Sequence, residues 1–204
     1  GSHIYCDTAL ICDVLERIAP TPSLYPAHSK GLARVVAQWA DDKLFWAAMA
    51  YNFHPKGVAQ MFGGGPPEQW GAMAKVFADD RTQMRVGMAR LPFADAAAAY
   101  RSYLRRLANM LDGQSYLLGA EASLADFSAY HPLWFTRTQT TAMAGILNDF
   151  PNVLAWMDRL AAIGHASFDE LNAVDAIALC AASPNGDAVL GHQPFQDEHG
   201  IALG

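Results

Sequence analysis

Apolar side chains recur every three or four residues along most of this chain, which is the spacing of one face of an α-helix. The pattern is longest over residues 29–53, where the stripe expected to face a core is Leu32, Val35, Val36, Trp39, Lys43, Trp46 and Ala50. Only Ile4-Tyr5-Cys6 is typical of a strand, and three residues cannot make a sheet without partners. The sequence therefore predicts an all-α fold.

Prolines, glycines and capping residues divide this pattern into separate helices. His54-Pro55 is expected to end the longest helix, because proline moves the residue before it out of the helical region. Pro132 is expected to perturb a later helix. The expected helices cover residues 7–18, 29–53, 68–90, 93–111, 124–135, 151–163 and 168–182.

Residues 121–131 read EASLADFSAYH and place a serine, an aspartate and a histidine close together. A hydrolase triad is disfavoured, because Asp126 and His131 are five positions apart and no GxSxG motif surrounds Ser123. Ser123 and Asp126 instead match a capping box, in which each side chain accepts a hydrogen bond from the other residue's amide at a helix start. We predict a structural capping box and assign no chemistry to His131.

The composition excludes several functional classes. The net charge of −6, with scattered basic residues, argues against nucleic-acid binding. The sequence shows neither a membrane-spanning stretch nor a signal peptide. Cys6, Cys12 and Cys180 form no CxxC pair, which favours the reducing cytoplasm.

A cluster of possible metal ligands near the end of the sequence contains His192, Asp197, Glu198 and His199. It has no HExxH spacing and no cysteine partners, so no metal site is predicted.

Two segments resemble the glutathione transferase superfamily. IYCDTALICDVLERIAPTPSLYP is similar to the last strand and third helix of the thioredoxin-like half and the linker after them. YLLGAEASLADFSAYHPLWF is similar to the capping-box segment of the all-helical half, in which Ser123 and Asp126 match the family's [ST]-x-x-D. The resemblance implies a helical bundle like the family's C-terminal domain, after a short thioredoxin-like remnant. The implied parts are a tag remnant at 1–3, the remnant and linker at 4–26, the helical domain at 27–182 and a tail at 183–204.

The resemblance also implies binding residues. Most of the thioredoxin-like half has no counterpart here, so no residue inherits the catalytic Ser, Tyr or Cys. Asp7-Thr8 matches the family's acidic residue and Ser/Thr that hold the γ-glutamyl end of glutathione, although both residues also favour a plain helix cap. Trp46, Tyr51 and Phe135 fall where the family lines its hydrophobic substrate pocket, although aromatics at helical spacing are also typical of a core.

The implied function is conjugation or reduction of small hydrophobic electrophiles with glutathione as co-substrate, without a tightly bound cofactor, in a cytoplasmic and bacterial homodimer. This chain alone is expected to lack the activity, because it carries no catalytic residue. The alternative is a non-catalytic helical module for dimerisation or partner binding.

Overall fold

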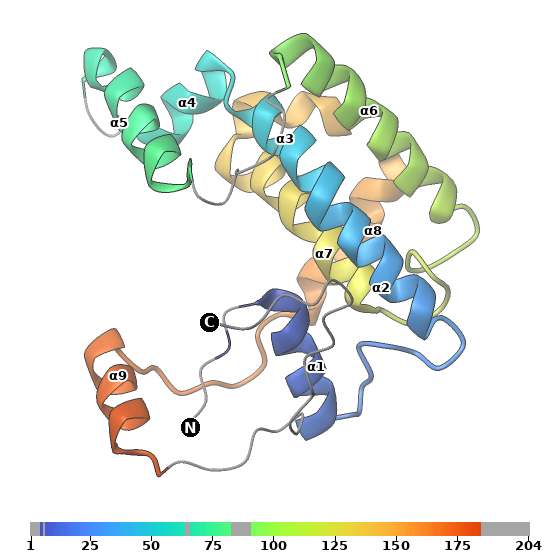
Figure 1. Cartoon of the computed structure of the whole chain (residues 1–204). Coiled ribbons are helices and arrows are strands. Elements are labelled where there is room, and N and C mark those ends of the chain that lie inside the picture. The colour runs from blue at the N-terminus through green and yellow to red at the C-terminus, as the bar shows by residue number, and fades with distance from the viewer. Residues whose placement is uncertain (1–4, 6, 64–65, 83–90, 185–204) are drawn as a thin grey trace, which may run out of the picture. The chain divides into compact units, whose positions relative to one another are not determined.

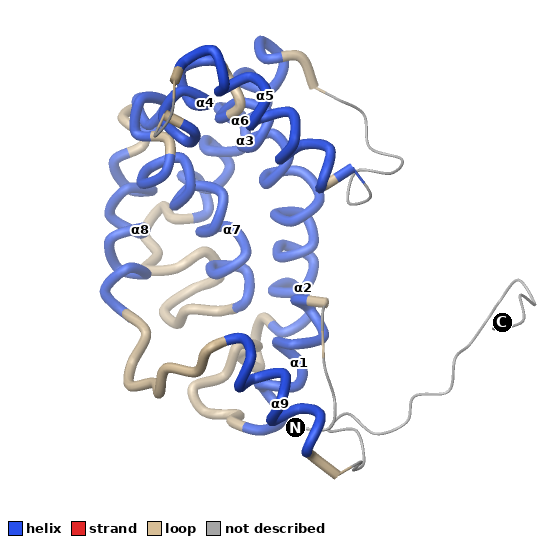
Figure 2. The backbone as a smooth tube through the Cα atoms, turned by 90° about the vertical axis from the view of Figure 1, so that its left-hand side faces the viewer, coloured by secondary structure: helices blue, strands red, loops and turns tan. Residues whose placement is uncertain are grey.

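The computed structural model describes residues 5, 7–63, 66–82 and 91–184 (Figure 1). Tyr25–Gly164 forms one compact unit, and the described residues within 1–24 and 165–204 form another. Apart from a single bridge between Tyr116 and Gly119, the described residues contain helices and loops without a strand (Figure 2). The predicted all-α fold is confirmed. Of the expected strand only Tyr5 is described, and it is not in a strand.

The unit Tyr25–Gly164 is the helical domain. Its elements are α2 (Lys30–Trp39), the π-turn η1 (Ala40–Leu44), α3 (Phe45–Asn52), α4 (Pro55–Phe62), α5 (Pro67–Asp80), α6 (Phe93–Met110), α7 (Leu124–Trp134), the π-turn η3 (Phe135–Gln139), the 3₁₀ segment η4 (Thr141–Leu147) and α8 (Pro151–Ile163). Its core is built chiefly from α3, α6, α7 and α8, whose largest fully buried side chains include Tyr100, Leu104, Leu133 and Trp156.

The longest helix forms where expected but turns a different face to the core. Helices α2 and α3 are continuous through η1. Leu32 and Val35 of the expected stripe are 53% and 63% exposed, so that stripe is wrong in this half. The buried face is made mainly of small residues, namely Ala33, Ala37, Ala40, Leu44, Ala47, Ala48 and Met49. Helix α2 packs against α7, and its buried residues are the alanines Ala33 and Ala37. The π-turn adds one residue to the helical turn and so shifts the buried face of the helix beyond Ala40.

Helix α4 was not expected from the sequence. His54-Pro55 does end α3, but Pro55 also occupies the first turn of the next helix, where its missing N–H costs nothing. His54 caps that helix, since its Nδ1 accepts from the Lys56 amide at 3.2 Å. Helix α5 starts near the expected position and ends earlier than expected, at Asp80, while residues 83–90 lie outside the described part.

The capping box predicted at the start of α7 is present. Asp126 is fully buried, and its Oδ2 accepts from the amide of Ser123 at 2.9 Å and from its hydroxyl at 3.0 Å. Its Oδ1 accepts from the Leu117 amide at 2.8 Å and from the Trp156 indole Nε1 at 2.9 Å. His131 is exposed, so these residues form no catalytic triad. The carboxylate ties the loop before α7 and helix α8 to one helix start.

A second buried polar cluster joins the end of α3 to the π-turn after α7. Asn52 Nδ2 donates to Thr136 Oγ1 at 2.9 Å, and Thr136 Oγ1 donates to the Pro132 carbonyl at 2.9 Å. Tyr100 OH shares a 2.9 Å hydrogen bond with the same Thr136 oxygen. Thr140 Oγ1 donates to Asn52 Oδ1 at 3.0 Å. The Asn52, Thr136 and Thr140 side chains and Tyr100 are all fully buried.

Threonine hydroxyls bond to the main chain where α7 passes into the π-turn η3. A proline in a helix removes one amide donor and disturbs the regular ladder. Thr136 and Thr138 follow Pro132, and their hydroxyls donate to the carbonyls of Pro132 at 2.9 Å and Trp134 at 2.8 Å. These side chains therefore bond to main-chain carbonyls at the point where the regular α-helical ladder changes.

The other unit contains α1 (Thr8–Ile18) and α9 (Ala173–Ala182). Glu16 of α1 fixes the segment that follows it, because its carboxylate accepts from the Ser23 hydroxyl at 2.5 Å and from the Leu24 amide at 2.7 Å. Helix α9 begins later than expected, because Asn172 caps it by accepting from the Asp175 amide at 2.9 Å. Residues 1–3 and all of the expected tail beyond residue 184 lie outside the described part.

Replacing Asp126 is expected to be among the most destabilising single changes in the helical domain. Asp126→Ala leaves four buried donors unpaired, so the free energy of unfolding should fall by about 3–5 kcal/mol. Ser123→Ala keeps the contacts to Leu117 and Trp156 and should cost about 0.5–2 kcal/mol. Urea unfolding followed by circular dichroism measures both losses. Equal losses in the two variants would contradict the central role of the carboxylate.

Tyr100 makes stability depend on alkaline pH. Burial raises the pKa of its phenol above the ordinary value of 10.0, and the hydrogen bond with Thr136 lowers it by less. The unfolded chain therefore releases this proton first, so this contribution is constant below pH 10 and declines at higher pH by up to about 1.4 kcal/mol per unit. Tyr100→Phe should flatten the decline in unfolding free energy between pH 9 and pH 11. Thr136→Val, which leaves the phenol in place, should retain the decline.

Candidate functional site

Asp7 and Thr8 lie at the start of α1. Asp7 is the N-cap, and its Oδ1 accepts from the Leu10 amide at 2.8 Å. Its carbonyl accepts from the Ile11 amide at 2.9 Å. Both Asp7 and Thr8 are exposed. The capping role is thus observed.

The Asp7 cap leaves other backbone amides at this helix start without a partner inside the helix. The geometry of an α-helix gives the first amides, here those of Thr8 and Ala9, no partner within the helix. Such amides and the helix dipole favour a ligand carboxylate. The Asp7 carboxylate is also a suitable partner for an ammonium group. The arrangement therefore suits the amino-acid end of a peptide, with a carboxylate and an ammonium on one carbon.

Tyr51 lies at the end of α3 among aromatic neighbours. Its hydroxyl donates to the Met143 carbonyl at 3.1 Å. Its ring stacks on Phe93, with centroids 5.5 Å apart and planes at 16°, and meets Tyr100 edge to face at 5.6 Å. Burial raises the pKa of the Tyr51 phenol, and the charge of Arg101 lowers it by less. Tyr51 thus offers a neutral, half-buried aromatic surface.

Trp46 and Phe135 are also half-buried. Trp46 packs edge to face on Phe45, with centroids 5.2 Å apart, shortly after the first π-turn. Phe135 packs against the main core and opens the second π-turn. The hydrogen bond from Asn52 to Thr136 joins the chain neighbours of Tyr51 and Phe135. The structure thus brings the segments of these two predicted pocket residues together.

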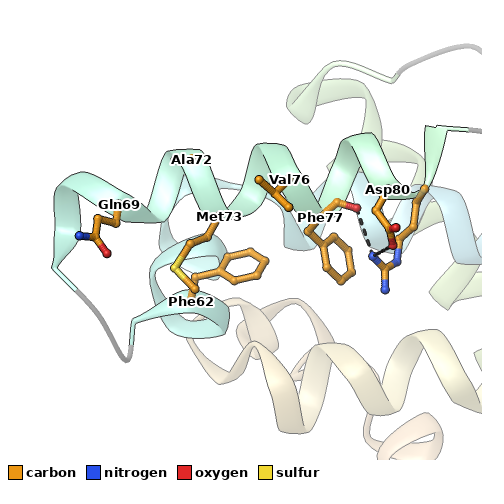
Figure 3. Close-up of a pocket in the computed structure, with 8 residues that line it drawn as sticks. Phe62, Gln69, Ala72, Met73, Val76, Phe77 and Asp80 are labelled. Atoms are coloured by element: carbon orange, nitrogen blue, oxygen red, sulfur yellow. Dashed lines mark hydrogen bonds and ion pairs between the residues drawn. The ribbon is translucent and has the colours of Figure 1, made fainter.

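A separate hollow of about 590 Å³ lies between α4 and α5. Figure 3 shows Met73 and Phe77 extending from α5 and Phe62 from α4. At one end the Arg81 guanidinium lies 3.6 Å from the centroid of the Phe77 ring and donates to the Phe77 carbonyl at 3.2 Å. The full lining is Phe62, Gln69, Ala72, Met73, Val76, Phe77, Asp80 and Arg81.

Sequence reasoning missed this apolar groove, which contains none of the predicted pocket residues. Its α5 residues lie three or four positions apart on one helix face, and that periodicity is the signal for it. The groove volume falls within the range of small-molecule sites, about 300–1,000 Å³.

The cluster His192, Asp197, Glu198 and His199 and the residue Cys6 lie outside the described residues. Within the described ranges, no group of three or more His, Cys, Asp or Glu side chains is arranged to hold a metal ion. Among those same ranges, every helix is too short or too polar to cross a membrane.

Comparisons with known proteins agree with the fold. A family model for the glutathione S-transferase C-terminal domain matches residues 69–159. A GST-like protein from Pseudomonas syringae has a similar structure, with a TM-score of 0.71 and 28% identity, over 99% of this chain and 60% of that chain. This chain therefore spans about three-fifths of that protein's length.

Beta-etherase LigF from Sphingobium sp. strain SYK-6 shares the fold at a TM-score of 0.53 and 22% identity, over 78% of this chain and 70% of that chain. No curated protein matches the sequence. The family match covers residues 69–159, within the helical domain, and supports a relation of that domain to the glutathione transferase superfamily.

Proposed function

We propose that this chain provides the helical part of a glutathione transferase that conjugates or reduces small hydrophobic electrophiles with glutathione. The observation that carries the proposal is Asp7-Thr8 at the start of α1, in a chain whose residues 69–159 match the glutathione S-transferase C-terminal domain. The exposed Asp7 carboxylate suits the ammonium of the γ-glutamyl group, and the amides of Thr8 and Ala9 suit its carboxylate.

The hydrophobic co-substrate is proposed to contact Trp46, Tyr51 and Phe135. All three are half-buried, so each keeps part of its aromatic surface accessible. Apolar surface of this kind binds apolar ligands through the area that both remove from water. A neutral Tyr51 phenol, bonded to the Met143 carbonyl, adds no charge to such a site.

No catalytic residue is proposed in this chain. In the superfamily a hydrogen bond to the glutathione sulfur stabilises the thiolate, which is the reactive form of a thiol. The matched residues supply contacts to the substrates and no such donor. We propose that the active protein is a cytoplasmic homodimer with no tightly bound cofactor.

A non-catalytic binding module is the second candidate. Helix α5 favours it, since none of its residues is buried and Met73 and Val76 are 43% and 69% exposed. A helix with this much exposed apolar surface is a typical contact for another protein.

Asp7 variants separate glutathione binding from capping. Asparagine caps a helix as well as aspartate does, but it has no charge to pair with an ammonium group. Asp7→Asn should keep the helical circular dichroism signal and weaken glutathione binding by about fivefold or more. Isothermal titration calorimetry with millimolar glutathione measures the affinity.

The matched control is Asp95→Asn, which neutralises an exposed carboxylate in the first turn of α6. It should bind glutathione as the wild type does. Absence of heat with the wild-type chain would contradict a glutathione site here. Equal affinity of wild type and Asp7→Asn would leave Asp7 as a cap alone.

A further inference from the structure

We propose that Thr136 and Asn52 are positioning residues for the electrophile pocket, setting the placement of Phe135 and Tyr51 through one buried hydrogen bond. This inference rests on the proposed function, because it assigns a role toward the same pocket. Neither residue is proposed to touch a substrate.

The bond is built from sequence-distant segments. Asn52 is the last residue of α3, and Thr136 is the second residue of the π-turn after α7. Their side chains meet at 2.9 Å, and both are 0% exposed. Each is the direct chain neighbour of a proposed pocket residue, so a shift of either backbone moves Tyr51 or Phe135 with it.

The hydroxyl of Thr136 is the centre of this contact. It meets Asn52 and Tyr100 and donates to the Pro132 carbonyl, all at 2.9 Å. A buried amide or phenol left without a partner is costly, so loss of this one oxygen favours rearrangement of all three groups.

Thr140 also forms hydrogen bonds with Asn52 and Phe135, which lie beside or in the proposed pocket. Thr140 donates to Asn52 Oδ1 at 3.0 Å, and its amide donates to the Phe135 carbonyl at 3.1 Å. Tyr51 also stacks on Phe93 and bonds to Met143. The contacts with Phe93 and Met143 therefore hold the Tyr51 ring itself. The Asn52–Thr136 hydrogen bond holds the end of α3 at a fixed distance from the backbone next to Phe135.

A regular α-helix after α7 would not make this contact in the same way. The π-turn adds one residue to the turn and changes the direction of the side chains that follow. Thr136 stabilises that turn and bonds to α3 through the same oxygen. Thr136 Oγ1 therefore takes part both in the local π-turn and in the long-range contact with Asn52.

Two matched variants test the proposal. Thr136→Val keeps the branched shape and removes the hydroxyl, whereas Thr136→Ser keeps the hydroxyl and removes a methyl group. The probe is 8-anilinonaphthalene-1-sulfonate, an apolar aromatic anion, titrated by its fluorescence into the full chain well below the unfolding temperature. Near-ultraviolet circular dichroism checks that each variant is folded.

Three further variants show where the probe binds and whether a loss of stability alone changes its affinity. Tyr51→Ala and Phe135→Ala should each weaken probe binding if these residues form the pocket. Val153→Ala, a fully buried truncation in α8, should lower stability without changing the affinity. If Thr136→Val fails to fold, Thr140→Val takes its place, because it removes the hydroxyl that donates to Asn52 Oδ1. Its probe affinity is then compared with that of the wild type.

The proposal expects Thr136→Val to weaken probe binding by about fivefold or more, and Thr136→Ser to restore wild-type affinity. Equal affinity of the valine and serine variants, with Tyr51→Ala and Phe135→Ala still impaired, would overturn the positioning role and leave the pocket intact. Probe binding that is insensitive to Tyr51→Ala and Phe135→Ala, or that is lost with Met73→Glu in the α4–α5 groove, would overturn the pocket assignment and the inference together.

Discussion

The helical domain depends on one buried carboxylate. Asp126 brings together the start of α7, the loop before it and the indole of Trp156 on α8. Each of its two oxygens accepts two hydrogen bonds, so the buried carboxyl group is well supplied with partners. Helix α7 then packs against α2, α3 and α8. Without a fixed start for α7, none of these contacts has a defined register.

Local signals in the sequence were sufficient for this part of the fold. Ser123 and Asp126 lie three positions apart, so their interaction is read directly from the chain, and Pro151 and Gly164 mark the ends of α8 in the same way. The core face of α2 was missed, because alanines have little weight in an apolar pattern dominated by Leu32 and Val35. The Asn52–Thr136 bond was missed because it joins segments far apart in the sequence, and the two π-turns have no distinctive apolar pattern that would reveal them.

Some candidate site residues can likewise be identified from local sequence features, whereas others depend on how distant segments pack. Asp7 was identifiable because a cap is a local feature, and the structure shows that role. The aromatic residues are harder to interpret, because half-buried Tyr51 and Phe135 serve the core and offer surface at once. The α4–α5 groove required the positions of two helices, one of which starts at a proline that also ends α3. The similarity to the glutathione S-transferase C-terminal domain covers residues 69–159, which include α7, whereas Asp7, Trp46 and Tyr51 lie outside that range.

The π-turn at Ala40–Leu44 sets the rotation of α3 about the axis that it shares with α2. Removing one residue from it would restore regular α-helical geometry and rotate α3 by about 100° relative to α2. Asn52 would then leave the side of the helix that faces Thr136, and the buried alanines of the two halves would no longer share a face. The number of residues between the start of α2 and Asn52 therefore sets the helical phase of α3, whichever side chain occupies an exposed position such as Asp42.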